Sequence, residues 1–214
     1  MERRPLARRP RARYVRTVSV HRSKGTRMSR TRLDLIVSTG GLATAVLFAV
    51  LGVVFRANGT FARDYVADQL GAQRIEFPAA DALTDDERAV PCLVGYAGTT
   101  VDDGAKAECY ANSYIGAHLA GIGGGETYAS LGAVQRGLRA EVQAAEAAND
   151  AGLPALRMRL DEVTADRETM FKGETLRGLL LTTYGFSIFG DKAMQAALVC
   201  LLVAAVMLVA ATAG

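Results

Sequence analysis

Two long apolar runs bracket the chain and limit what it can fold into. Leu35–Phe55 is a stretch of 21 residues and Ala193–Ala211 a stretch of 19, and neither contains a charged side chain. At 1.5 Å per helical residue, each run would extend roughly 30 Å, which is the hydrocarbon thickness of a bilayer. The pattern therefore predicts two transmembrane helices, at 34–55 and 193–212, that flank a domain at 56–192.

The first run has two other interpretations. A buried core helix of a soluble protein rarely needs so many unbroken apolar residues. A cleavable signal peptide has an apolar region of about 7–15 residues followed by small residues at the cleavage site. Here the run is longer, and Phe55-Arg56-Ala57-Asn58 is a poor cleavage site. The sequence favours an uncleaved anchor.

The second run is preceded by a further apolar segment, Leu179–Phe189. A membrane-buried helix that included both would exceed the bilayer, so we expect Asp191 and Lys192 to lie at the outer interface. Aromatic residues just before this point are typical of the headgroup region. They are Tyr184, Phe186 and Phe189.

The distribution of charge predicts the orientation. Residues 1–33 carry twelve Lys and Arg residues and one acid, Glu2, whereas residues 56–192 have a net charge of −7. Because basic residues stay on the cytoplasmic side, we expect both termini inside and the domain outside the plasma membrane. A basic tail beside a span is better explained by topology and anionic lipid than by nucleic acid. We expect the tail to be disordered, and a start at Met28 would leave residues 1–27 untranslated.

The domain has mainly helical periodicity, so the sequence predicts an all-α fold. A first helix continues the anchor through Phe61–Leu70, and a last one, Ala155–Tyr184, runs into the second span. Leu156, Met158, Phe171 and Leu179 are among the candidate core residues of the last helix.

Shorter signals predict the elements between these two helices. Thr84 and Glu87 have the spacing of a capping box. Tyr110, Tyr114 and His118 lie four residues apart, along one face of a helix expected at Asp103–Ala120. Another helix is expected at Glu126–Asn149, and a short extended segment at Ile75–Pro78.

The cysteines give the most specific chemical prediction. Cys92 and Cys109 both belong to the external domain, whereas Cys200 lies inside the second span and cannot reach them. Outside the cytoplasm, such a pair favours a disulfide over two free thiols. A zinc site is disfavoured, because the domain has one histidine and no CxxC spacing.

Candidates for catalysis are few. His118 is the only histidine of the domain, and a lone histidine on a helix face is usually structural. The glycine-rich segment 121–125 lacks the phosphate-binding motifs, and the acids near 85 and 102 lack the spacing of a calcium loop. We expect no enzyme activity, no catalytic residue, no cofactor and no metal.

Three segments carry a resemblance: Phe61–Leu70, Arg74–Pro78 and Phe171–Gly185. In these segments the chain resembles a family of uncharacterised actinobacterial membrane proteins with the same order of anchor, helical domain and anchor. The resemblance covers Met28 to the end and implies this topology without an established activity. Some members carry an aromatic ring-opening dioxygenase label, but one external histidine cannot supply the two that such an iron site needs.

These observations favour a non-enzymatic accessory or interaction subunit of the cell envelope. The predicted partners are the lipid bilayer and either another membrane protein or further copies of the chain. Glu174 and Arg177 are the candidate interaction residues, because they combine charge with small and apolar neighbours close to the membrane. An extracytoplasmic ligand sensor and a membrane-bound enzyme are the alternatives.

Overall fold

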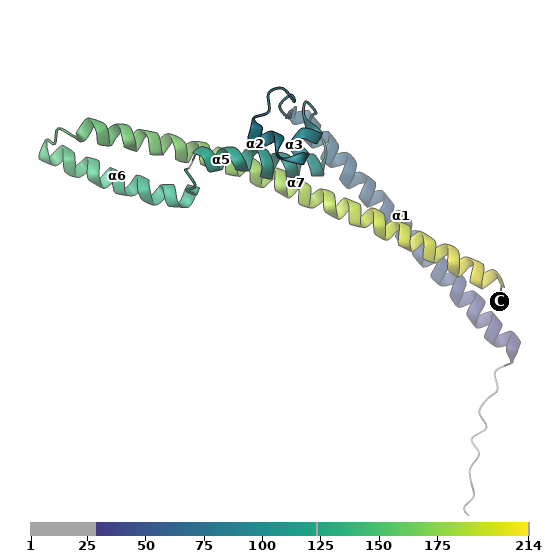
Figure 1. Ribbon diagram of the computed structural model, residues 1–214. Helices are drawn as coiled ribbons and strands as arrows, with labels where there is room; N and C mark the ends of the chain where they lie inside the picture. The colour runs from purple at the N-terminus through teal and green to yellow at the C-terminus, as the bar shows by residue number, and fades with distance from the viewer. Residues whose placement is uncertain (1–28, 123, 214) are drawn as a thin grey trace, which may run out of the picture.

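The fold is dominated by two long helices that run antiparallel to each other (Figure 1). The computed structural model describes residues 29–122 and 124–213. Most of the predicted basic tail lies outside these residues, and Arg30 begins the first helix. The elements are α1 (Arg30–Gln73), α2 (Asp85–Arg88), α3 (Pro91–Tyr96), α4 (Gly104–Cys109), η1 (Tyr110–Ile115), α5 (Gly116–Ile122), α6 (Tyr128–Ala148) and α7 (Leu153–Ala213). The all-α prediction is confirmed for the described residues.

Helices α1 and α7 join the predicted spans to the domain without a break. α1 has 44 residues and α7 has 61, so they extend about 66 Å and about 92 Å. The expected continuation of the first run through Leu70 is confirmed, as is the continuation of the last domain helix into the second run. The ends of the apolar runs, near residues 55 and 192, therefore fall inside continuous helices.

Short helices α2–α5 pack at the junction where α1 ends beside the middle of α7 (Figure 1). Their core contains large side chains that are almost completely buried, among them Leu70, Leu93, Val101 and Leu180. Between α1 and α2, the expected extended segment pairs with a later loop through one antiparallel bridge, Glu76 to Thr100. The predicted capping box at α2 is confirmed, because the Thr84 side chain accepts from Glu87 N–H and Glu87 accepts from Thr84 N–H.

Helix α6 folds back along the first part of α7 and forms a projecting two-helix arm (Figure 1). Leu131, Leu138 and Ala145 recur every seven residues and are buried against α7. The turn between the helices depends on Asn149, which has φ 50° and ends α6 in the left-handed conformation. This conformation suits asparagine better than most residues.

The helix expected at Asp103–Ala120 is present as the consecutive helical segments α4, η1 and α5, of which η1 is a π-helical turn. One sequence expectation needs correction. In α7, three candidate core residues are exposed instead: Met158, Phe171 and Leu179 are 69%, 57% and 63% accessible. One helix in contact with α6, α1 and α5 at different levels has no single buried face, so a periodicity argument along it fails.

Candidate functional site

The apolar sections of α1 and α7 meet through small residues. Ala45, Gly52 and Gly59 on α1 lie seven residues apart and are buried, as are Ala197 and Ala204 on α7. A Cβ at Gly52 would lie 2.7 Å from Leu201 Cγ, and one at Gly59 would lie 3.0 Å from the Gly190 carbonyl oxygen. A Cβ at either position would have to displace the Leu201 or Met194 side chain and would crowd a carbonyl oxygen of α7. We call this contact the small-residue seam.

Around the seam, the same sections expose their large side chains. Val46, Val53, Leu202 and Val206 are each more than half accessible. In each helix, only 11% of the most apolar 18-residue window is buried, whereas the core helix of a soluble protein would be mostly buried. Both helices are long and apolar enough to span a membrane.

The apolar run of α1 and the apolar run of α7 lie side by side over the same part of the helix pair. The built Cβ of Gly41 lies 3.2 Å from Ala211 Cβ near one end of the pair. Towards the other end, Arg63 Nη2 lies 2.7 Å from Asp191 Oδ1. Both partners of this ion pair are about half-exposed, so it fixes register more than it adds stability.

A charged cleft lies between α1, the start of α4 and α7, with a volume of about 410 Å³. Five of its lining residues are charged: Arg63, Asp64, Asp102, Asp103 and Asp191. Three of these acids have partners within the chain. Asp191 pairs with Arg63, Asp102 Oδ1 lies 2.7 Å from Lys106 Nζ, and Asp103 caps α4 by accepting from Lys106 N–H. Asp191 therefore joins α7 to α1, whereas Asp102 and Asp103 contact Lys106 within their own segment at the start of α4.

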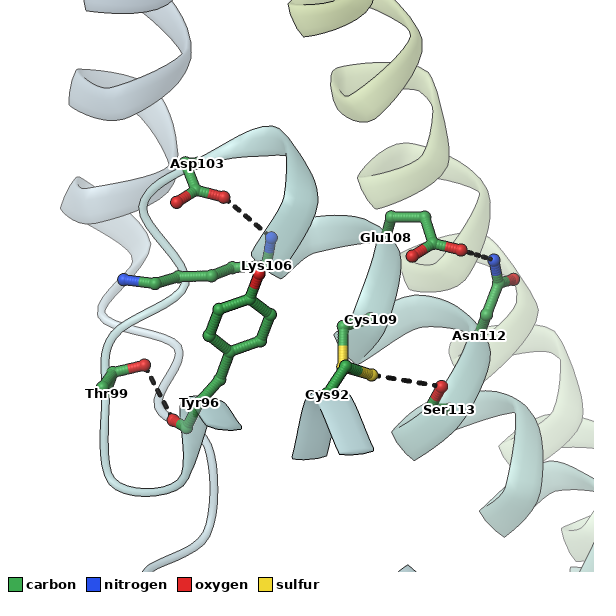
Figure 2. Close-up of a disulfide and its surroundings, with 9 residues drawn as sticks. All are labelled: Cys92, Tyr96, Thr99, Asp103, Lys106, Glu108, Cys109, Asn112 and Ser113. Carbon is green, nitrogen blue, oxygen red and sulfur yellow. Dashed lines mark hydrogen bonds between the residues drawn. A yellow bond between two sulfur atoms is a disulfide. The ribbon is translucent and has the colours of Figure 1, made fainter. Parts of the chain in front are cut away.

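The predicted cysteine pair is joined as expected. Cys92 of α3 and Cys109 of α4 form a disulfide, with their Cα atoms 6.1 Å apart (Figure 2). Cys109 is 1% accessible and belongs to the core, and Cys92 Sγ lies 3.6 Å from Ser113 Oγ. Cys200 is buried in α7 as a free thiol. The bond ties α3 to α4, two helices too short to be stable alone.

Glu174 and Arg177 lie together on α7, and they contact each other and Asn112 of the same chain. Arg177 Nη1 lies 3.3 Å from Glu174 Oε2, and Arg177 Nη2 donates to Asn112 Oδ1 of η1 at 3.3 Å. Arg177 precedes Lys192 by 15 residues, which places it about 22 Å along the helix from the predicted interface. The pair is thus further from the predicted interface than the sequence suggested. Glu174 remains exposed.

His118 ends a ladder of aromatic rings. The Tyr110–Tyr114 and Tyr114–His118 ring centroids are 4.9 Å and 4.5 Å apart, which confirms the expected common face. His118 Nδ1 bonds the Tyr114 carbonyl oxygen, and its Nε2 lies 3.9 Å from Glu87 Oε1. The backbone N–H of Thr84 lowers the pKa of Glu87, and burial raises the pKa of Tyr110. In this position His118 links α5 to α2.

The arm contains a polar network that the sequence did not predict. Gln135 is 4% accessible, donates to Thr164 Oγ1 and accepts from Arg167 Nη1. The Arg167 guanidinium also lies 4.4 Å above the Tyr128 ring and donates to its hydroxyl. The only sequence signal was a polar residue at a buried heptad position of α6. The network fixes how α6 pairs with α7.

No cluster of three or more histidine, cysteine or acidic residues that could hold a metal occurs within residues 29–122 and 124–213. No protein-family model matches the chain, and neither curated proteins nor solved structures give a match. The resemblance to the actinobacterial family therefore stays a prediction.

Proposed function

We propose that the chain is an integral membrane protein with spans at 34–55 and 193–212. The observation that carries this proposal is the pairing of two level apolar sections that bury small residues and expose large ones. A signal peptide would leave the mature chain after cleavage, yet the first apolar run forms one continuous helix with the domain and pairs with the second run along its length. Exposed apolar surface on this scale needs a nonaqueous solvent.

The proposed orientation has both termini in the cytoplasm of the cell and residues 56–192 outside the plasma membrane. Arg30 and Arg32 begin α1 at the end of the pair remote from the domain, and most of the acids lie in the domain. Basic residues beside a span stay inside. The Cys92–Cys109 disulfide supports the same orientation, because such bonds persist in oxidising compartments.

We propose further that the domain is a non-enzymatic interaction or accessory part of the cell envelope. Its shape supports this use, since the arm of α6 and α7 projects well beyond the junction (Figure 1). The groups that suggested chemistry have partners within the domain: His118 lies beside Glu87 of α2, and Asp102 and Asp103 both contact Lys106 at the start of α4. The exposed Glu174 is the proposed contact for a membrane-protein partner or a further copy of the chain.

Cysteine labelling tests the orientation. In a Cys200→Ser background that keeps the disulfide, Ser29→Cys and Ala140→Cys place single thiols at exposed positions on opposite ends of the molecule. A membrane-impermeant maleimide applied to sealed right-side-out vesicles should label Ala140→Cys alone. Labelling of Ser29→Cys alone would reverse the topology, and equal labelling of both would contradict membrane insertion.

Co-purification from mild detergent tests the proposed contact. Glu174→Ala removes an exposed carboxylate whose partner is Arg177. Glu168→Ala removes a similar carboxylate six residues earlier, whose partner is Lys172. We expect Glu174→Ala to reduce recovery of the partner and Glu168→Ala to leave it unchanged. Equal recovery with both variants would exclude Glu174 from the interface.

A further inference from the structure

The two sides of the helix pair differ sharply just beyond the apolar sections. On one side lies the charged cleft, which is bordered by Arg63 and Asp191 and covered by the start of α4. On the other side, two adjoining hollows of about 480 Å³ and 310 Å³ share Phe186. None of the residues that line these two hollows is charged. We call the two hollows together the aromatic groove.

The aromatic groove is open and lined by large rings. Phe61, Tyr65, Phe186 and Phe189 are 61%, 50%, 41% and 76% accessible. The Tyr65 and Phe186 rings meet edge to face across the two helices, with centroids 6.2 Å apart. An uncovered cluster of this size in water would be unfavourable, so it indicates a ligand or an apolar environment.

The groove is apolar towards the first span, except for Asn58, whose amide already donates to the Val54 carbonyl oxygen, and it is more polar at its other end. Its lower end includes Phe55, inside the first proposed span, and its upper end includes Gln69, beyond Tyr65. Phe55 and Gln69 are 14 residues apart, so the groove is about 21 Å long. A hydrocarbon chain suits the lower part, and the Gln69 amide can donate to an ester carbonyl at the top.

We propose that the aromatic groove seats an acyl chain of a membrane lipid, which rises from the leaflet next to the domain as far as Tyr65 and Phe186. The opposite side faces water at the same level, because the charged cleft occupies it. The proposal rests on the proposed membrane insertion. A lipid is favoured over a second copy, because the groove continues the lipid-facing surface of the spans and a second copy would have to displace lipid from it.

Tryptophan fluorescence tests this directly, since the chain has no tryptophan. Tyr65→Trp places an indole in the groove, and Ala67→Trp places one in the charged cleft two residues later; both positions are exposed. Leu47→Trp reports on the span. Each variant is reconstituted into phosphatidylcholine vesicles whose acyl chains carry bromine, with unbrominated vesicles as the control.

We expect marked quenching of Tyr65→Trp and Leu47→Trp and little quenching of Ala67→Trp, because bromine quenches indole fluorescence only at short range. Quenching of Leu47→Trp alone would overturn the lipid groove and leave membrane insertion intact; a second copy seated on the groove would give this result. Equal quenching of Tyr65→Trp and Ala67→Trp would overturn the one-sided contact. No quenching of Leu47→Trp would contradict the proposed insertion itself.

Discussion

The apolar part of the α1–α7 pair buries small residues and exposes large ones, whereas the core of the α2–α5 domain also buries large apolar side chains. Gly52 and Ala197 are buried at the seam while Val46 is 57% accessible beside it. In the domain, Leu93 and Val101 are completely buried. Burial of large apolar side chains stabilises a fold in water. In lipid that gain disappears, and helices associate through close backbone contact. The two regions thus fit two solvents.

Loss of the disulfide should have the largest effect, and it should be confined to the domain. For Cys92→Ser/Cys109→Ser, we expect the free energy of unfolding of the domain to fall by about 3 kcal/mol, because the unfolded loop is no longer closed. Hydrogen exchange can follow both regions in one detergent-solubilised sample. Exchange should rise in α3, α4 and η1 and stay unchanged in the apolar part of α1.

Cys200→Ser is the control, because this free thiol lies in the apolar part of α7. If exchange in the disulfide variant rose equally in the apolar part of α1, the two regions would unfold as one unit, which would contradict their separate stabilisation.

Overpacking the small-residue seam should disrupt the contact between α1 and α7 and leave the fold of the domain unchanged. Gly52→Leu forces a side chain against Leu201 and the Ala197 carbonyl, at a cost of about 2 kcal/mol. A cysteine pair at Gly41 and Ala211, whose Cβ atoms would be close, reports on the contact by oxidative crosslinking. We expect Gly52→Leu to reduce the yield of this crosslink. Gly40→Leu should not, since a Cβ there meets nothing within 4 Å.

Removing the Glu87 carboxylate should destabilise the domain in a pH-dependent way. Glu87→Ala deletes half of the capping box, which is worth about 1 kcal/mol. The native pKa of Glu87 is below its ordinary value of 4.5, so its stabilisation is present above pH 4.5 and is lost as the pH falls through the native pKa. Unfolding curves of wild type and variant should converge in acid. Asp86→Ala, a change at the exposed neighbour, should show a smaller difference.

Arg177→Ala should have the smallest effect on folding. Its ion pair with Glu174 is partly exposed and its bond to Asn112 is long, at 3.3 Å, so we expect a loss of about 0.5 kcal/mol. If the surface around Glu174 binds a partner, Arg177→Ala should reduce recovery of the partner far more than such a small loss of folding stability would. Unfolding of the domain by Arg177→Ala, with association of the residual folded fraction unchanged, would make the residue structural.

Local signals predicted part of this fold. Three features depend on residues that are neighbours along the chain, and the sequence predicted all three. They are the capping box at Thr84, the aromatic ladder that ends at His118, and the continuity of α1 and α7. The Cys92–Cys109 pairing was also predictable, because Cys200 lies inside an apolar run.

Tertiary features were not predictable in the same way. The seven-residue spacing of Ala45, Gly52 and Gly59 is visible in the sequence. The residues of α7 that these three meet depend on how the two helices are aligned along their length. The aromatic groove and the charged cleft exist only once that register is set. The π-helical turn at η1 gave no signal in the sequence, and α3 is too short for a periodic one.

One measurement compares the two regions with matched probes. Val46 and Val94 are 57% and 50% accessible, the first in the apolar half of α1 and the second in α3. Nitroxide labels at Val46→Cys and Val94→Cys, in a Cys200→Ser background in vesicles, can be tested by spin resonance for collision with oxygen and with a water-soluble nickel chelate. We predict preference for oxygen at Val46 and for nickel at Val94. Preference for nickel at both positions would contradict the two-solvent account.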